Sequence, residues 1–263
     1  MADLVEPADN LLHPEVAHDE RLEVDGRAEE CQKLLPIHVD RQRLLTNDFT
    51  GDLVVGYLWM EKVIGGLDEV RHVEVSPVDG RADVTLAREV TLPTERILTS
   101  GCGGGITFRI DHRLFPRLTS RLRVRPDALS LRMRDLFAAA VHYKASRGIH
   151  GAALTDGEQL LLVAEDVGRH NAVDKIKGAA LRRGIPTEDR ILLSTGRISS
   201  EMLLKAARMG VPLVASRTSP TEMAVALAEQ LNVTVCGYVR TDGLNLYAGT
   251  GLLLDEEVGA IRG

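Results

Sequence analysis

Residues 160–175 decide the fold: they read Leu160-Leu161-Leu162-Val163-Ala164, then Glu165-Asp166-Val167-Gly168-Arg169-His170-Asn171-Ala172-Val173-Asp174-Lys175. The first five residues are an apolar run of strand length. From Ala172 to Ala180, apolar residues recur at the spacing of one helix face. The polar cluster therefore falls where a buried strand ends and an amphipathic helix begins. Open α/β sheets bind ligands at such places, because strand ends leave a crevice and helix N-termini present free N–H groups.

This polar cluster also has a purely structural interpretation. Asp or Asn near a helix start can simply cap the helix, and Arg169 with Glu165 or Asp166 can form a surface ion pair of little energetic value. Five kinds of polar or ionisable side chain converging on one turn are, however, more typical of a ligand site. The sequence therefore favours a functional site at this junction.

Regular alternation of strand and helix begins near residue 128 and continues to Cys236. A helix is predicted over 131–143, followed by strands over 152–154 and 160–164 around a turn at Thr155-Asp156-Gly157. The pattern indicates an α/β fold, with a layered ligand-binding domain over residues 128–263.

The first half of the chain lacks this regular alternation of strand and helix. Residues 1–20 are acidic and aperiodic, and we expect a loosely ordered N-terminus. Residues 21–114 read as a small α+β subdomain, joined to the larger domain by a Pro- and Arg-rich linker at 115–127. The helix and strands predicted for this subdomain occupy residues 52–63, 70–75, 82–86 and 106–110.

Composition excludes several classes of partner. The formal net charge is −6 and only 3% of residues are aromatic, which disfavours a nucleic-acid groove because such grooves need clustered Lys/Arg and stacking platforms. No apolar run is long enough to span a membrane, and the sequence starts without the basic and apolar segments of a secretory signal. We therefore expect a cytoplasmic protein with no nucleic-acid or membrane partner.

Two other strand ends lead into loops of similar composition. Ser194-Thr195-Gly196-Arg197 follows the strand at 191–193, and Ser216-Arg217-Thr218-Ser219-Pro220 follows the strand at 213–215. Each loop offers hydroxyls, one Arg and backbone N–H groups before a helix, which suits a phosphate. Ser219-Pro220-Thr221-Glu222 also reads as a capping box, but a cap uses only one or two of the free N–H groups. Together with the 165–175 cluster, the loops predict a phosphate-bearing ligand.

Cysteine chemistry, if present, is carried by single residues. Cys31, Cys102 and Cys236 are too far apart for a disulfide framework or a zinc site, and we expect no metal site. Cys102 lies between Gly101 and Gly103, so its sulfur can be exposed and reactive as the thiolate, or buried beside a tight turn; the spacing leaves both open. Cys236 follows an apolar strand and is predicted to lie in the core.

Three motifs, at residues 165–175, 194–202 and 215–221, make the chain resemble the FdhD/NarQ family of formate dehydrogenase accessory sulfurtransferases over about residues 52–247. The resemblance implies a cytoplasmic homodimer with a cytidine-deaminase-like α/β domain. It further implies that sulfur arrives as a persulfide from a cysteine desulfurase and passes to the bis(molybdopterin guanine dinucleotide) molybdenum cofactor destined for formate dehydrogenase. GDP would mimic part of that cofactor.

The resemblance also assigns residues. Cys102 takes the persulfide position, and His150, at a helix–strand junction, is either a ligand contact or a structural hydrogen-bonding residue. Residues 238–243 match a segment associated with cofactor binding. The full set of candidate cofactor-binding residues is His150, Gly168, Arg169, His170, Asn171, Asp174, Lys175, Ser194, Thr195, Gly196, Arg197, Ser216, Arg217, Thr218, Tyr238, Val239, Arg240, Thr241, Asp242 and Gly243.

The chain departs from the family pattern in ways that keep other functions open. Gly105 stands where many members have the second Cys of a Cys-x-x-Cys, and Ser146-Arg147-Gly148 replaces Thr-Gly-Gly. One nucleophilic sulfur still suffices for a persulfide carrier. The main alternative is a cofactor-binding chaperone without sulfur chemistry. A nucleotide hydrolase using Asp166, Asp174 and Glu165 to hold Mg²⁺ has no evident nucleophile, and zinc-dependent deamination has no ligands.

Overall fold

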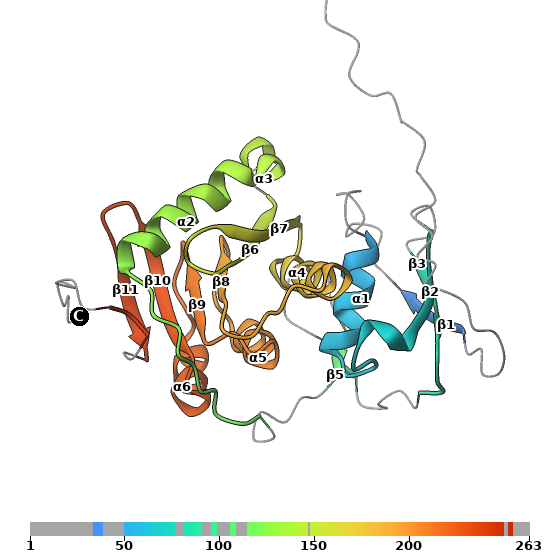
Figure 1. The fold of residues 1–263 in the computed structure, drawn as a ribbon. Helices are drawn as coiled ribbons and strands as arrows, with labels where there is room; N and C mark the ends of the chain where they lie inside the picture. Colours follow the sequence, from blue (N-terminus) through green and yellow to red (C-terminus); the bar gives the residue numbers. More distant parts are fainter. Residues whose placement is uncertain are drawn as a thin grey trace, which may run out of the picture.

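Figure 1 shows the fold in a computed structural model that describes residues 34–38, 50–76, 81–90, 96–98, 106–108, 115–146, 148–249 and 252–254. In the first half the elements are β1 (Leu34–His38), α1 (Thr50–Met60), the 3-10 turn η3 (Leu67–Glu69), β2 (Val70–Ser76), β3 (Arg81–Leu86), β4 (Arg96–Leu98) and β5 (Ile106–Phe108). In the second half they are α2 (Pro126–Ala139), α3 (Val141–Ser146), β6 (His150–Thr155), β7 (Leu160–Asp166), α4 (Arg169–Arg183), β8 (Ile191–Ser194), α5 (Ser200–Arg208), β9 (Leu213–Ser216), α6 (Glu222–Leu231), β10 (Thr234–Arg240) and β11 (Gly243–Ala248).

The second half is built on a six-stranded mixed sheet with the strand order β11-β10-β9-β8-β6-β7. β8, β9 and β10 run parallel to one another, whereas β6 is antiparallel to both β7 and β8, and β11 is antiparallel to β10. The protein is therefore of the mixed α/β class, as the alternation of strand and helix predicts.

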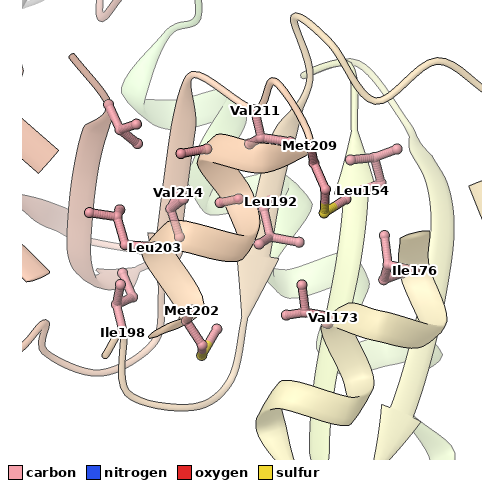
Figure 2. Close-up of a cluster of buried hydrophobic side chains, with 14 of the residues drawn as sticks. Leu154, Val173, Ile176, Leu192, Ile198, Met202, Leu203, Met209, Val211 and Val214 are labelled. Carbon is pink, nitrogen blue, oxygen red and sulfur yellow. The ribbon is translucent and has the colours of Figure 1, made fainter. Parts of the chain in front are cut away.

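Helices cover both faces of this sheet. Leu129, Met133 and Leu136 of α2 pack on one face, with Ala153, Leu193 and Cys236 among the strand residues beneath them. Helices α4, α5 and α6 cover the other face, and Figure 2 shows part of that core, including Val173, Ile176, Met202 and Leu203 against Leu154, Leu192 and Val214. Burial of these apolar side chains provides the main driving force for the layering.

The first half of the chain is anchored to the second through α1, which lies against α4 (Figure 1). A Cβ on Gly56 would stand 1.8 Å from the Asp174 carbonyl oxygen, and one on Gly178 would stand 1.8 Å from the Asp52 carbonyl oxygen. The two helix backbones therefore touch, and only glycine fits at the crossing. The other face of α1 packs on β2 and β3, which form a three-stranded sheet with β1.

Charged and aromatic side chains reinforce this crossing. The Asp52 carboxylate accepts a 2.8 Å hydrogen bond from Arg182. Two cations contact the Trp59 ring, with Lys177 Nζ 4.0 Å and the Arg208 guanidinium carbon 4.6 Å from the ring centroid. Such contacts stabilise most where the groups are withdrawn from water, and Lys177 is buried.

Several element boundaries differ from the sequence-based expectations. The helix expected over 131–143 is two helices, because α2 ends at Ala139 and α3 begins at Val141 after the C-cap residue Ala140. α2 also starts at Pro126, inside the predicted linker 115–127, since proline suits the first helical position. The helix expected over 52–63 ends at Met60, where Lys62 follows in the left-handed region with φ 61°. β1, β4 and β11 were not predicted.

Candidate functional site

Strand pairing brings the predicted site segments to one edge of the six-stranded sheet. Ser194 pairs with Ser216 across β8 and β9, His150 pairs with Asp166 across β6 and β7, and Ala152 pairs with Ser194. β10 runs parallel to β9, so the segment beginning at Tyr238 continues past the same edge. Five segments from separate parts of the sequence therefore lie next to one another at this edge, as predicted from their positions at strand ends.

The two Ser-containing loops have the same local geometry. Ser194 Oγ accepts the Gly196 N–H at 3.1 Å, and Ser216 Oγ accepts the Thr218 N–H at 3.1 Å. The helices that follow are capped alike, because Ser199 accepts the Met202 N–H and Thr221 accepts the Ala224 N–H. The loops are therefore a structural repeat. The predicted capping box over 219–222 is wrong, because Thr221 and not Ser219 is the N-cap of α6, and Pro220 lies before the helix. A bridge between Ile198 and Pro220 holds the loops together.

His150, Arg169 and Gly196 meet at the centre of this edge. A Cβ on Gly196 would lie 2.9 Å from His150 Nδ1 and 3.3 Å from Arg169 Cβ, so glycine is needed there for close approach. His150 Nδ1 and Arg169 Nε are buried, and neither has a hydrogen-bond partner within the described part of the chain. Burial, and secondarily the Arg169 charge, lower the pKa of His150, while the nearby Asp166 charge opposes this. The environment of His150 therefore favours the neutral imidazole.

Asp166 organises the turn from β7 into α4. Its Oδ1 accepts the Gly168 N–H at 2.9 Å and the Asn171 side-chain amide at 3.0 Å, while its Oδ2 pairs with Lys175 Nζ at 2.8 Å. Lys175 Nζ also donates to the Glu165 carbonyl oxygen at 2.9 Å. Asp166, Asn171 and Lys175 are buried, and their contacts with one another fix the start of α4. Asp166 thus pairs with Lys175, and Gly168 takes the N-cap position without a side-chain cap.

Two ionic contacts, one helical turn apart, join α4 to α5. His170 Nε2 lies 3.1 Å from Ser199 Oγ and 3.3 Å from Glu201 Oε2. One turn along, Lys205 Nζ lies 2.5 Å from Asp174 Oδ1, and Asp174 is buried. Burial raises the pKa of Asp174 to about 6, although the Lys205 charge opposes this shift.

Tyr238 sits at this edge in a strained conformation. Its φ of 50° lies in the left-handed region that bulky residues avoid, and its N–H donates to the Thr218 carbonyl oxygen at 3.2 Å. The side chain is partly exposed, with the Arg240 guanidinium 5.9 Å from the ring centroid. Thr241 and Asp242 form the turn into Gly243, because Arg240 pairs with Gly243. Such strain is typical of ligand-binding positions.

The two arginines of the paired loops differ in environment. Arg197 is exposed, whereas Arg217 is half-buried and reaches the Val239 carbonyl oxygen at 3.5 Å. Its backbone N–H donates to the Ser194 carbonyl oxygen at 3.1 Å, which ties the second loop to the first.

The structure describes the environment of one of the three cysteines. Cys236 is fully buried, and burial raises the pKa of its thiol to about 12, which confirms the prediction that it belongs to the core. Cys31 and Cys102 lie outside the described residues. The strands that flank the Cys102 segment are paired, with Leu98 opposite Ile106.

Sequence reasoning assigned no site role to Ser199, Glu201 or Lys205, and it considered Asp166 only in a surface ion pair or as a Mg²⁺ ligand. Asp166 and Glu201 lie within the quoted motifs, but nothing in their spacing separates an organising residue from a ligand contact. Lys205 could have been found as the residue one turn after Glu201, facing Asp174.

Across the ranges that the structure describes, three or more His, Cys, Asp or Glu side chains nowhere gather in an arrangement suited to a metal ion. Nor is any helix in those ranges long and apolar enough to cross a membrane.

The protein is of the α/β class, and its mixed sheet carries small, hydroxyl-bearing loops along the edge at which open α/β sheets bind ligands. The FdhD/NarQ family model matches residues 38–253, and the chain belongs to that family. It is 38% identical over 208 residues to the sulfur carrier protein FdhD of Bacillus subtilis, covering 77% of this chain and 79% of that protein. It is 35% identical over 212 residues to the sulfur carrier protein FdhD of Staphylococcus aureus, covering 78% and 80%. A crystal structure of a Desulfotalea psychrophila protein, named as a formate dehydrogenase accessory protein, superposes with a TM-score of 0.64 at 28% identity, covering 79% of this chain and 80% of that one.

Proposed function

We propose that this protein is a sulfur carrier that serves formate dehydrogenase maturation, taking sulfur from a cysteine desulfurase and delivering it to the bis(molybdopterin guanine dinucleotide) molybdenum cofactor. The observation that carries the proposal is the convergence of five predicted segments on one sheet edge, where His150 Nδ1 and Arg169 Nε are buried with no hydrogen-bond partner among the described residues. A buried polar nitrogen left unpaired costs roughly 1–3 kcal/mol, so a ligand that satisfies both would be held there. The names of the curated relatives and of the solved structure supply the sulfur-carrier and formate dehydrogenase parts of the proposal.

The residues at this edge suit a guanine dinucleotide as the sulfur acceptor. Its pyrophosphate would lie against the repeated loops, where backbone N–H groups, hydroxyls, Arg197 and Arg217 can bind phosphate oxygens. Tyr238 offers a planar ring for stacking against a heteroaromatic base. We infer that the C-terminal domain has the cytidine-deaminase-like architecture implied by the family, used here to bind rather than to deaminate.

Cys102 would carry the sulfur. Its thiolate attacks the sulfane sulfur of the donor's persulfide, so that a new S–S bond forms on Cys102 while the donor's S–S bond breaks and the donor cysteine leaves as a thiolate. Buried Cys236 is unsuited to this step, because a thiol with a raised pKa is rarely ionised at neutral pH. A cytoplasmic location and a homodimeric state are part of the proposal by family resemblance.

The test is the mass of the intact protein after exposure to a cysteine desulfurase and cysteine. We expect a gain of labile sulfur that thiol reductants remove and that Cys102→Ala abolishes, whereas Cys236→Ala leaves it unchanged. If wild-type protein gains no sulfur under conditions in which the donor itself is loaded, the chaperone function replaces the carrier function. Labelling of Cys31 equal to that of Cys102 would also count against the assignment.

A further inference from the structure

Glu201 puts a negative charge at the place where an anion is expected to bind. It lies in the first turn of α5, two residues after the N-cap Ser199, and its carboxylate is 38% exposed. An acidic side chain in the first turn interacts favourably with the helix dipole. The same field attracts a phosphate, so the Glu201 carboxylate competes with an anionic ligand for the α5 N-terminus.

His170 is the side chain that can offset this charge. Its Nε2 is 3.3 Å from the Glu201 carboxylate and 3.1 Å from the Ser199 hydroxyl, and its side chain is only 15% exposed. Imidazole is the side chain whose ordinary pKa, about 6.5, lies nearest to physiological pH. The protonated ring forms an ion pair with Glu201, while the neutral ring can only share a hydrogen bond with it.

We propose that Glu201 is an affinity-determining residue for the anionic ligand of this edge, and that His170 controls it by gaining or losing a proton. With His170 protonated, the pair is neutral and the positive field of the α5 N-terminus is available to a phosphate. With His170 neutral, Glu201 repels the ligand. The inference rests on the proposed function, since it specifies how the phosphate part of the same ligand site is regulated.

Other charged groups lie near His170, and their effects on the pH dependence must be distinguished from its own. Arg169 precedes it on α4, and Arg197 lies in the loop before α5. Asp174 and Lys205 form the ion pair one turn further along, and burial raises the pKa of Asp174 to about 6, within the same pH range. His150, whose pKa is lowered by burial, lies across Gly196. Only a change at Glu201 or His170 should remove the proposed effect, because the other groups are present in every variant compared.

The repeated loop supplies a matched control. Glu222 lies in the first turn of α6, which follows the second loop as α5 follows the first, and its side chain is exposed. The contact of His170 is with Glu201, at the start of the other helix. Replacing Glu222 removes the same charge from the equivalent helix start but leaves the His170 contact in place.

The experiment is calorimetric titration of the full-length protein with a GDP-sugar at pH 5.5, 6.5 and 7.5. The probe contains guanine and a pyrophosphate diester, so it lacks the terminal phosphate group of GDP, which titrates near pH 6. We expect wild-type affinity to be about fivefold higher at pH 5.5 than at pH 7.5, the effect of removing one nearby like charge. Glu201→Gln should bind tightly at both pH values, His170→Gln should bind weakly at both, and Glu222→Gln should keep the wild-type ratio.

The outcomes are distinguishable from those of the proposed function. Binding of the GDP-sugar that is independent of pH, or that depends on pH as strongly in Glu201→Gln as in the wild type, overturns this inference while leaving the ligand site intact. If the wild-type protein does not bind the GDP-sugar or GDP at any pH, the proposed ligand site itself is wrong. Circular dichroism of each variant at both pH values separates misfolding from lost affinity.

Discussion

Ser194 and Ser216 occupy directly paired positions on β8 and β9, and each hydroxyl oxygen accepts the backbone N–H of the residue two positions further along. The similarity of the two loops therefore extends from sequence to backbone geometry. Arg197 and Arg217 follow in the two loops, and under the proposed function both would bind the pyrophosphate.

Replacing either Arg with Ala should weaken GDP binding. A charge-assisted contact to phosphate contributes about 1.5–3 kcal/mol, so affinity measured by calorimetry should fall roughly ten- to a hundredfold. Guanosine should bind more weakly than GDP and respond little to either change. Equal affinity of the wild-type protein for GDP and guanosine would show that the loops do not bind phosphate.

Gly196→Ala should damage the ligand site without unfolding the protein. The added Cβ would stand 2.9 Å from His150 Nδ1, so the imidazole must shift away from its place beside Arg169. Loss of one hydrogen bond to the ligand corresponds to roughly a tenfold loss of affinity for GDP. Gly148→Ala is the control, because the nearest atom to its added Cβ is 3.9 Å away. If Gly196→Ala binds GDP as the wild type does, His150 has no part in binding.

Asp174 should make the protein less stable as pH rises. Its pKa is raised to about 6 in the folded state from an ordinary 3.8, so the folded state holds its proton more tightly than the unfolded chain does. The corresponding stability is fully present below pH 3.8 and is lost as pH rises through 6. The free energy of unfolding should be measured in urea at pH 4.5 and 7.5 for the wild type and for Asp174→Asn. The wild-type value minus the Asp174→Asn value should be about 1–3 kcal/mol larger at pH 4.5 than at pH 7.5. A difference that is constant with pH, or larger at pH 7.5, contradicts the raised pKa.

The α1–α4 crossing should not tolerate a single methyl group. Alanine is normally favoured over glycine within a helix by about 1 kcal/mol. Gly178→Ala should nevertheless lower the free energy of unfolding by at least about 2 kcal/mol, because its Cβ would overlap the Asp52 carbonyl oxygen. Stabilisation of the variant in urea unfolding would mean that the two helices do not touch.

The sequence predicted that the 165–175 cluster and both loops would lie at one edge of the sheet, because that prediction depends on local signals. Apolar runs ending in Asp166, Ser194 and Ser216 could each be read as strand ends, and parallel strands place such ends together. The registers confirm the placement of the 165–175 cluster and of both loops at one edge. Whether each residue contacts the ligand stays a prediction.

Partner choice within the cluster could not be predicted, because it depends on contacts between distant segments. The structural interpretation of the cluster paired Arg169 with Glu165 or Asp166 at the surface, whereas the structure pairs buried Asp166 with buried Lys175. The Asp174–Lys205 pair needs the packing of α4 on α5, and the α1–α4 crossing needs two glycines 122 residues apart in the sequence to meet. The predicted division of the chain at 115–127 likewise stays a prediction.

The most direct measurement is the rate at which iodoacetamide alkylates Cys102, followed by peptide mass spectrometry with and without saturating molybdopterin guanine dinucleotide. Sulfur transfer needs the persulfide within about 3–3.5 Å of its acceptor, so the proposed function requires the Cys102 sulfur and the bound ligand to share one site. We expect bound ligand to slow alkylation of Cys102 and to leave that of Cys31 unchanged. The same Cys102 rate with and without bound ligand would contradict a shared site for sulfur and acceptor.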